Sequence, residues 1–240
     1  MKISASYYTS KGNRSNNEDN ISLLENRDNV VAVIADGLGG ESNGEKASLI
    51  TIQTINARLS GGNVNTEKVK NAITSANDEI IKSQDRENKM KSTVAVLCID
   101  SIRAIAANVG DTRVYHFRKG KILYQSIDHS VSQMSVAVGE INAEDIRGHA
   151  DRNRLTLALG SKRTVEADIT ESVAIAGDSF LLCSDGFWEY VHEDEMVEDL
   201  KTSGSADEWI NKMRGRVEAR ITPKGDNHSA IVIILGKKDV

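Results

Sequence analysis

Between residues 92 and 125 the chain repeats short apolar stretches that leave no room for a helix between them. The stretches are rich in β-branched and aliphatic residues and include Val94–Ile99, Ala104–Val109 and Arg113–Phe117. Gly110-Asp111 and Lys119-Gly120 provide turn signals. Parallel strands need a crossover connection of a dozen or more residues, so the spacing predicts an antiparallel meander.

Helical patterns are grouped rather than alternating with single strands. Two helices, about 44–59 and 66–86, are predicted after a strand at Val30–Ala35, and a third begins with the capping pattern Ser205-Ala206-Asp207-Glu208. Further strands are predicted at Phe180–Cys183 and Ala230–Leu235. This grouping favours an α+β fold in which helices cover antiparallel sheets.

The length and composition fit one domain. The chain has 240 residues, of which 39% are hydrophobic, and its single proline, Pro223, lies in no linker-like stretch. We therefore expect one domain over residues 1–240. The polar segment at about 130–163 has short apolar patches only, so it is either a loosely packed subdomain beside a site or an ordinary surface excursion.

Charge and cysteine content narrow the function classes. A net charge of −5, from 30 basic and 35 acidic residues spread along the chain, argues against broad binding to nucleic acids or anionic membranes. Cys98 and Cys183 each lie inside an apolar run, which argues against a disulfide framework or a cysteine zinc site. We find no signal-peptide pattern and no membrane-spanning run, and we expect a cytoplasmic protein.

Asp36 directly follows a predicted strand and is followed by glycines. A carboxylate at a strand end, beside glycines that let backbone carbonyls approach, suits a hard cation with oxygen ligands. A dinucleotide-binding loop would need glycine at position 42, where the chain has Ser42. The other alternative is that Asp36-Gly37 forms a plain turn with no function.

Three further aspartates stand at the edges of predicted strands: Asp128, Asp185 and Asp226. Each one taken alone is an ordinary turn former. If the strand edges converge, the four aspartates form an acidic cluster that repels itself unless divalent cations bind.

A short polar loop near the N-terminus combines Arg14 with Glu18 and Asp19. The planar guanidinium of Arg14 could hold a phosphate group through paired hydrogen bonds. A solvated loop cation is the alternative on local evidence alone.

Several motifs occur in a fixed order along nearly the whole chain. They are Gly12-x-Arg14-x-x-Asn17-Glu18-Asp19, Asp36-Gly37-x-Gly39-Gly40, Ser92-Thr93, Asn108-Val109-Gly110-Asp111-Thr112-Arg113, Asp128-His129-Ser130, His149-x-x-Arg152-Asn153-x-Leu155-x-x-Ala158-Leu159-Gly160, Ser184-Asp185-Gly186 and Asp226-Asn227-x-Ser229. The ordered set resembles the metal-dependent serine/threonine protein phosphatases of type 2C in their compact bacterial form. The resemblance implies a four-layer α-β-β-α sandwich, two antiparallel sheets flanked by pairs of helices, with a metal cluster at one end and a mobile flap within 130–163.

The resemblance also implies roles for individual residues. Asp36 would bridge two Mn²⁺ or Mg²⁺ ions, and the remaining ligands would be Asp185 and Asp226 for the first ion and the Gly37 carbonyl for the second, with Glu18 and Asp19 acting through water. Asp128 would hold a third ion together with Asp185. Arg14 would grip the phosphoryl oxygens, and Asn227 would support the ligands from beside Asp226.

These residue types suit phosphate-ester hydrolysis. Two such cations lower the pKa of a shared water, so that a metal-bridged hydroxide attacks phosphorus without a phosphoenzyme. Two positions depart from the family. Leu38 stands where some members have a histidine that is a candidate general acid, and Lys91 stands where glycine is usual before Ser92-Thr93. The segment between Asp128 and His149, where the flap of the family lies, is also shorter than in many relatives, so substrate choice is expected to differ.

The sequence thus predicts a monomeric cytoplasmic phosphatase, dependent on two or three Mn²⁺ or Mg²⁺ ions, that acts on phosphoserine or phosphothreonine in proteins. The family analogy further implies that it opposes a bacterial Ser/Thr kinase. Two alternatives stay open. A catalytically silent phosphoprotein-binding module should have lost metal ligands, whereas a small-molecule phosphomonoesterase would prefer metabolites to phosphopeptides.

Overall fold

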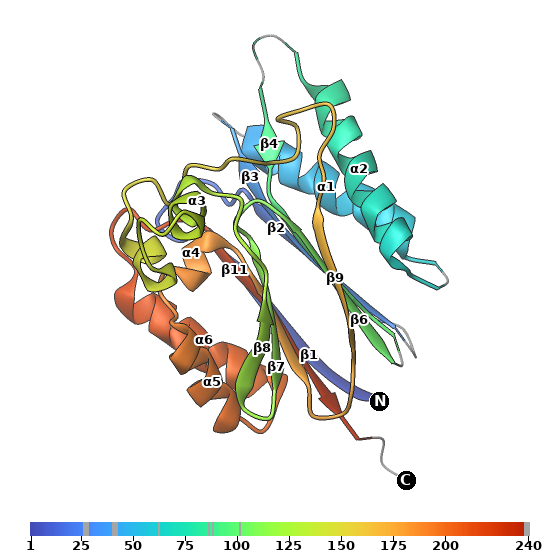
Figure 1. The fold of residues 1–240 in the computed structure, drawn as a ribbon, viewed down its shortest axis with the longest axis vertical. Helices are drawn as coiled ribbons and strands as arrows, with labels where there is room; N and C mark the ends of the chain where they lie inside the picture. Colours follow the sequence, from blue (N-terminus) through green and yellow to red (C-terminus); the bar gives the residue numbers. More distant parts are fainter. Residues whose placement is uncertain are drawn as a thin grey trace.

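The computed structural model describes residues 1–25, 29–39, 43–61, 63–85, 87, 89–100 and 102–237. Gly40, Ser42 and Arg86, on which expectations from the sequence fall, lie outside the described residues. Two antiparallel sheets lie face to face, and helices cover the outer face of each (Figure 1). This is the four-layer α-β-β-α sandwich, so the expected fold is confirmed.

The first sheet brings the two ends of the chain together. Its strands, in spatial order, are β1 (Lys2–Ser10), β11 (His228–Gly236), β10 (Ser179–Cys183), β7 (Arg113–Arg118) and β8 (Lys121–Gln125). β1 pairs only with β11 among the described strands, from Lys2 opposite Gly236 to Ser10 opposite His228. The loop after β1 is therefore held next to the start of β11.

The second sheet carries the strand that ends in Asp36-Gly37. Its order is β2 (Asp19–Glu25), β3 (Val30–Leu38), β5 (Val94–Ile99), β6 (Arg103–Val109) and β9 (Asp168–Val173), and the short β4 (Lys91–Ser92) pairs with the end of β3. β3 extends beyond the predicted end at Ala35, because Gly37 and Leu38 pair with Ser92 and Lys91.

The predicted meander is divided between the two sheets. β5 pairs with β6 and β7 pairs with β8, but β6 and β7 belong to different sheets. The chain crosses over at residues 110–112, where Gly110 has a φ of +97° and a Cβ would lie 2.6 Å from the Thr93 side chain. This correction matters for function, because the crossing places Asp111 at the end of the sandwich.

Helices pack on both outer faces and close the core. α1 (Asn43–Leu59) and α2 (Thr66–Ser83) cover the second sheet, while α5 (Glu193–Lys201) and α6 (Ala206–Arg220) cover the first (Figure 1). The predicted capping at Ser205 is confirmed by its side chain, which accepts a hydrogen bond from the Glu208 N–H at 3.2 Å. A third apolar cluster fills the space between the sheets.

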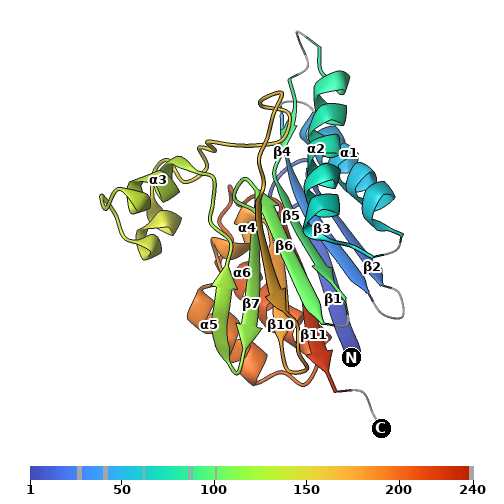
Figure 2. The ribbon, with the colours of Figure 1, turned by 45° about the vertical axis from the view of Figure 1, so that its right-hand side comes forward.

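The segment 130–163 lies beside the sandwich (Figure 2). It contains α3 (Val131–Ala137) and a 3₁₀ turn, η1 (Ala143–Gly148). Arg147 in η1 attaches it to the body by donating to the Trp188 carbonyl at 3.0 Å and to Glu193 at 2.9 Å. Trp188 ends the short helix α4 (Asp185–Trp188), so this segment is held next to the strand ends that carry the aspartates.

Trp209 should be a main support of α6 on the first sheet. It is fully buried, packs edge-on against Phe117 at 5.3 Å between ring centroids, and donates from Nε1 to the Met196 carbonyl at 3.0 Å. We expect Trp209→Ala to lower the free energy of unfolding by about 3–5 kcal/mol in urea titrations. Ile102→Ala is the control, since Ile102 is 63% exposed, and it should cost less than about 0.5 kcal/mol. Equal effects of the two substitutions would contradict the packing described.

Candidate active site

A cavity of about 160 Å³ opens where the ends of several strands meet. Acidic side chains make up much of its lining, and they come from segments that are distant in sequence. The lining residues are Arg14, Glu18, Asp36, Gly37, Leu38, Gly39, Asp111, Asn153, Leu155, Asp185, Asp226 and Asn227. Five carboxylates therefore share one cavity with a single cationic side chain.

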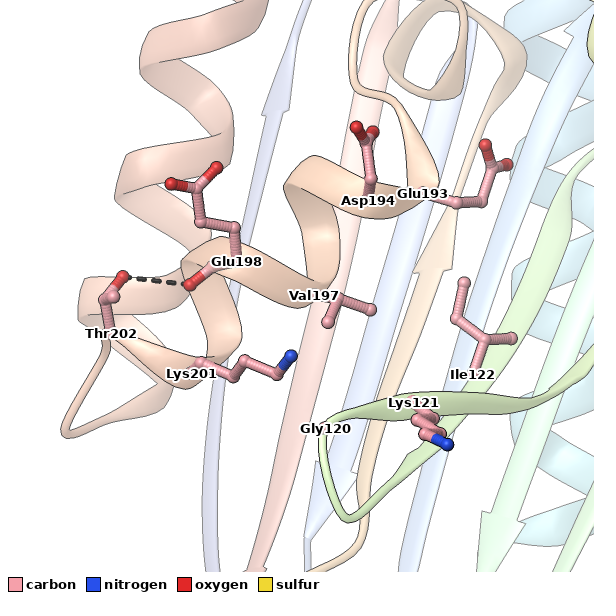
Figure 3. A pocket seen from close by; sticks show the side chains of 9 residues that line it. All are labelled: Gly120, Lys121, Ile122, Glu193, Asp194, Val197, Glu198, Lys201 and Thr202. Carbon is pink, nitrogen blue, oxygen red and sulfur yellow. Dashed lines mark hydrogen bonds between the residues drawn. The ribbon is translucent and has the colours of Figure 1, made fainter.

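A larger cavity of about 580 Å³ lies between the β7–β8 turn and α5 (Figure 3). It too has carboxylates in its lining, but Glu193 and Glu198 point away from each other. Glu193 already accepts hydrogen bonds from the Tyr115 hydroxyl and from Arg147, each at 2.9 Å. The acidic cavity is the better candidate because its charges are close together and largely uncompensated.

Strand pairing fixes the backbone of Asp36. Its N–H donates to Thr93 Oγ1 at 3.1 Å and its carbonyl accepts from the Thr93 N–H at 2.8 Å. Asp19 lies opposite Asp36 on the neighbouring strand β2. The sequence therefore puts two carboxylates side by side through the register of one strand pair.

Asp19 is buried but only half satisfied. Its Oδ2 accepts hydrogen bonds from the hydroxyls of Ser184 and Ser229, each at 2.7 Å, whereas its buried Oδ1 has no hydrogen-bond partner among the described residues. A buried oxygen with a lone pair to spare is costly unless a cation or water approaches it.

Asp185 and Asp226 come from the first sheet. Asp185 begins α4 directly after β10, and its Oδ1 accepts the Gly186 N–H at 2.6 Å. Asp226 precedes β11, and its Oδ1 accepts the Asn227 N–H at 2.8 Å. Each carboxylate is thus oriented by a backbone amide, which leaves its second oxygen for other partners.

Asn227 fastens the N-terminal loop to this end of β11. Its Nδ2 donates to the carbonyls of Lys11 and Asn16, each at 2.8 Å, and its Oδ1 accepts the Glu18 N–H at 2.8 Å. Arg14 lies within the fastened loop, and its Nη2 is 2.6 Å from Asp226 Oδ2. The loop therefore places both Arg14 and Glu18 at the cavity.

Close backbone approach is required at Gly37. A Cβ at this position would lie 2.0 Å from the Gly44 carbonyl oxygen, and a Cβ at Gly44 would lie 2.6 Å from the carboxyl carbon of Glu18. Neither position accepts a side chain without displacing the backbone or Glu18. The absence of a side chain at Gly37 and Gly44 thus allows the start of α1 to pack closely against Gly37 and Glu18.

Burial and mutual repulsion raise the pKa of four carboxyl groups at or beside the cavity, those of Asp19, Asp36, Asp111 and Asp185. Burial, with smaller contributions from neighbouring carboxylates, raises the pKa of Asp19 to about 6 and that of Asp111 to about 7. The same causes raise the pKa of Asp36 and of Asp185 well above the ordinary range. The cavity therefore favours either bound protons or bound cations.

The residues fit divalent cations, although they do not form a closed ligand set by themselves. Among the described residues, no three His, Cys, Asp or Glu side chains converge closely enough to hold a metal ion as they stand. The unpartnered Asp19 Oδ1, the clustered carboxylates and the hard oxygen donors all suit Mg²⁺ or Mn²⁺.

The structure brings together most, but not all, of the predicted site residues. Arg14, Glu18, Asp36, Gly37, Asp185, Asp226 and Asn227 line the cavity, and Asp19 lies directly behind it. Asp128 does not line the cavity. Both of its carboxylate oxygens instead accept hydrogen bonds from the buried Arg113, at 2.8 and 2.6 Å. Asp111, which the sequence analysis did not single out, takes a place in the lining instead.

Two neighbouring positions bear on acid catalysis. Leu38 lines the cavity with an apolar side chain. His129 is occupied elsewhere, since its Nδ1 accepts the Gly110 N–H at 3.1 Å and its Nε2 lies 3.5 Å from Asp168. His129 thus supports the β6–β7 crossing by its hydrogen bond to the Gly110 N–H.

Comparison with known proteins gives one family. A family model described as protein phosphatase 2C matches residues 9–224. The serine/threonine phosphatase stp of Listeria monocytogenes is 34% identical over 224 residues, which cover 87% of this chain and 88% of that protein.

Solved structures agree with this result. The crystal structure of the Mycobacterium tuberculosis serine/threonine phosphatase PstP/Ppp is similar with a TM-score of 0.86 at 26% identity, covering 98% of this chain and 99% of that one. The catalytic domain of PstP, in complex with two manganese ions, is similar with a TM-score of 0.83 at 25% identity, covering 98% and 99%.

The raised pKa values predict how stability depends on pH when divalent cations are removed with EDTA. Between about pH 4 and 7 the folded protein holds protons on Asp19 and Asp111 that the unfolded chain has released, because free carboxyls titrate near 4. These groups therefore make the free energy of unfolding fall as pH rises through this range. In Asp111→Asn the fall should be shallower, so the variant should be more stable than wild type at pH 7 in EDTA.

Urea titrations at several pH values check this, with Asp78→Asn on the exposed face of α2 as the matched control. Added Mn²⁺ should stabilise the wild type at pH 7 more than the Asp111→Asn variant. Parallel pH profiles of wild type and Asp111→Asn in EDTA would refute the electrostatic description of the cavity.

Proposed function

The chain belongs to the protein phosphatase 2C family, and from that premise we propose that the acidic cavity is its catalytic centre. The protein is a metal-dependent serine/threonine phosphatase that acts on phosphoproteins. The observation that carries the placement of the centre is the gathering of five carboxylates around one guanidinium at the strand ends.

Asp36, Asp185 and Asp226 are the proposed side-chain ligands, with the Gly37 carbonyl as a backbone ligand and Glu18 and Asp19 acting through water. All but Asp19 line the cavity, and Asp19 Oδ1 is unpartnered among the described residues. For a third ion we assign Asp111 beside Asp185, rather than Asp128, because Arg113 occupies both oxygens of Asp128. Divalent cations bound to such ligands lower the pKa of water and neutralise charge on a phosphoryl group.

Arg14 is the proposed phosphate-binding residue. Its side chain is 54% exposed and reaches Asp226 from the loop that Asn227 fastens. A phosphoryl group entering the cavity would offer its oxygens to the same guanidinium, and charge-assisted pairs of this kind position the phosphorus for in-line attack. Because Leu38 cannot donate a proton, the leaving oxygen must obtain its proton from a group other than residue 38.

Several further properties are part of the same proposal. One catalytic domain spans the chain, with 130–163 as its flap, since Asn153 and Leu155 from this segment line the cavity. The enzyme works as a monomer in the cytoplasm and opposes a bacterial Ser/Thr kinase. Buried, unpaired Cys98 and Cys183 are in keeping with a reducing compartment. No helix among the described residues is long and apolar enough to span a membrane.

Removing the charge of Asp36 should abolish catalysis without unfolding the protein. We expect Asp36→Asn to lower kcat for an aryl phosphate and for a phosphothreonine peptide by about a thousandfold or more, since it removes one of the carboxylates that would hold the metal ions. Wild-type activity should require Mn²⁺ or Mg²⁺ and vanish in EDTA. Asp78→Asn serves as the control and should retain full activity.

No turnover by a folded, metal-binding wild type would instead favour the silent binding module. Turnover of phosphorylated metabolites well above that of phosphopeptides would favour the small-molecule phosphomonoesterase.

Replacing Arg14 should separate substrate binding from metal binding. Arg14→Ala should lower kcat/KM for the phosphothreonine peptide by about 10- to 100-fold, the loss expected for charge-assisted hydrogen bonds. Affinity for Mn²⁺, measured by calorimetry, should not fall, because the substitution frees Asp226 Oδ2. A variant that loses Mn²⁺ affinity while kcat/KM at saturating Mn²⁺ is unchanged would show that Arg14 supports the metal site rather than the substrate.

A further inference from the structure

A second hollow continues directly from the acidic cavity. It measures about 350 Å³ and is lined by Leu38, Lys91, Asn153, Leu155, Thr156, Leu157, Ala158, Ser161 and Lys162. Three of these residues, Leu38, Asn153 and Leu155, also line the acidic cavity. We call this hollow the lysine groove. A peptide with its phosphorylated side chain in the acidic cavity would have to lay neighbouring residues against the surface around it, of which this groove is a part.

The two adjoining hollows have opposite charge. The acidic cavity has five carboxylates in its lining, whereas the nine lining residues of the lysine groove include two lysines and no acidic residue. Lys91 and Lys162 are both exposed, and neither ammonium group takes part in a hydrogen bond or an ion pair with any residue that the structure describes. Both ammonium groups are therefore available to a ligand.

Backbone hydrogen bonds join the two segments that line the lysine groove, one around Lys91 and one after Leu155. Ser92 and Leu159 exchange two backbone hydrogen bonds, of 3.1 and 2.8 Å, which bind the segment after Leu155 to the strand that carries Lys91. This link brings the two lysine-bearing segments to one groove although they are far apart in sequence.

Asn77 of α2 fixes the backbone around Lys162, in the second lysine-bearing segment of the lysine groove. Its buried side chain accepts the Gly160 N–H at 2.9 Å and donates to the carbonyls of Lys162 and Arg163, at 3.1 and 3.2 Å. Gly160 has a φ of +80°, which favours glycine at this turn. The backbone that presents Lys162 is thus ordered before any ligand binds, which reduces the entropic cost of binding.

We propose that Lys91 and Lys162 select phosphoprotein substrates that carry acidic side chains within a few residues of the phosphoserine or phosphothreonine. This inference rests on the proposed function of the acidic cavity and adds a substrate class to it. The lysine groove attracts carboxylates that the unfilled acidic cavity would repel, so it orients an acidic segment beside the phosphoryl group.

The test compares phosphothreonine peptides that differ only in their flanks, with two Glu or two Gln on each side. The Mn²⁺-loaded wild type should show a kcat/KM about fivefold higher for the Glu peptide, the preference expected from two exposed ion pairs. The preference should shrink in high salt. In the Lys91→Gln/Lys162→Gln double variant the two peptides should be hydrolysed equally well, and a Lys91→Glu/Lys162→Glu double variant should prefer a peptide flanked by Lys.

Lys121→Gln is the matched control, because Lys121 lines the separate cavity beside α5, and it should keep the fivefold preference. An aryl phosphate has no flanks, so all the lysine variants should hydrolyse it at the wild-type rate. If the wild type hydrolyses the aryl phosphate but shows no preference for Glu, or if the double variant keeps the preference, this inference is overturned and the proposed function stands. If the aryl phosphate is not hydrolysed with Mn²⁺, the proposed function fails and the inference with it.

Discussion

The cost of burying several carboxylates close together is the constraint around which this molecule is organised. Five of them share one cavity, and a sixth, Asp19, lies buried behind it with an unpartnered oxygen. Carboxylates do not attract one another, so the fold of the backbone must hold them close together. Strand register places Asp19 opposite Asp36, and the ends of β10 and the start of β11 supply Asp185 and Asp226. The stability of the sandwich thus supports an arrangement that is unfavourable until cations bind.

Much of the fold could be predicted from local patterns, because apolar runs and capping residues encode strands and helices directly. β1, β2 and β9 were not predicted, since their residues are half-buried and too polar to form an apolar run. The division of the meander between two sheets was also missed, because pairing between strands depends on contacts that spacing does not encode. Gly110-Asp111 was a turn signal in the sequence, but only the structure shows that this turn, with a positive φ at Gly110, carries the chain from one sheet to the other.

The candidate site shows the same limit at the level of single side chains. Asp36, Asp185 and Asp226 could be found because each follows or precedes a clear strand. Asp111 and Asp128 both stand beside strands and turns, and the sequence gives no means of deciding between them. The decision comes from Arg113, which lies in the strand after Asp111 and pairs with both oxygens of Asp128. This ion pair is a property of the folded chain, so local patterns could not show that Asp111, and not Asp128, lines the cavity.

The pairing of β1 with β11 has a consequence for the order in which the molecule can be completed. β1 precedes every other described strand in the chain, yet its only partner among them is β11, which follows all the others. Arg14 and Glu18 follow β1, and the Asn227 side chain that fastens their loop immediately precedes β11. A nascent chain whose synthesis has not yet reached β11 therefore has neither a fastened phosphate-binding loop nor Asp226. It cannot act on phosphoproteins until β11 has been made and has paired with β1.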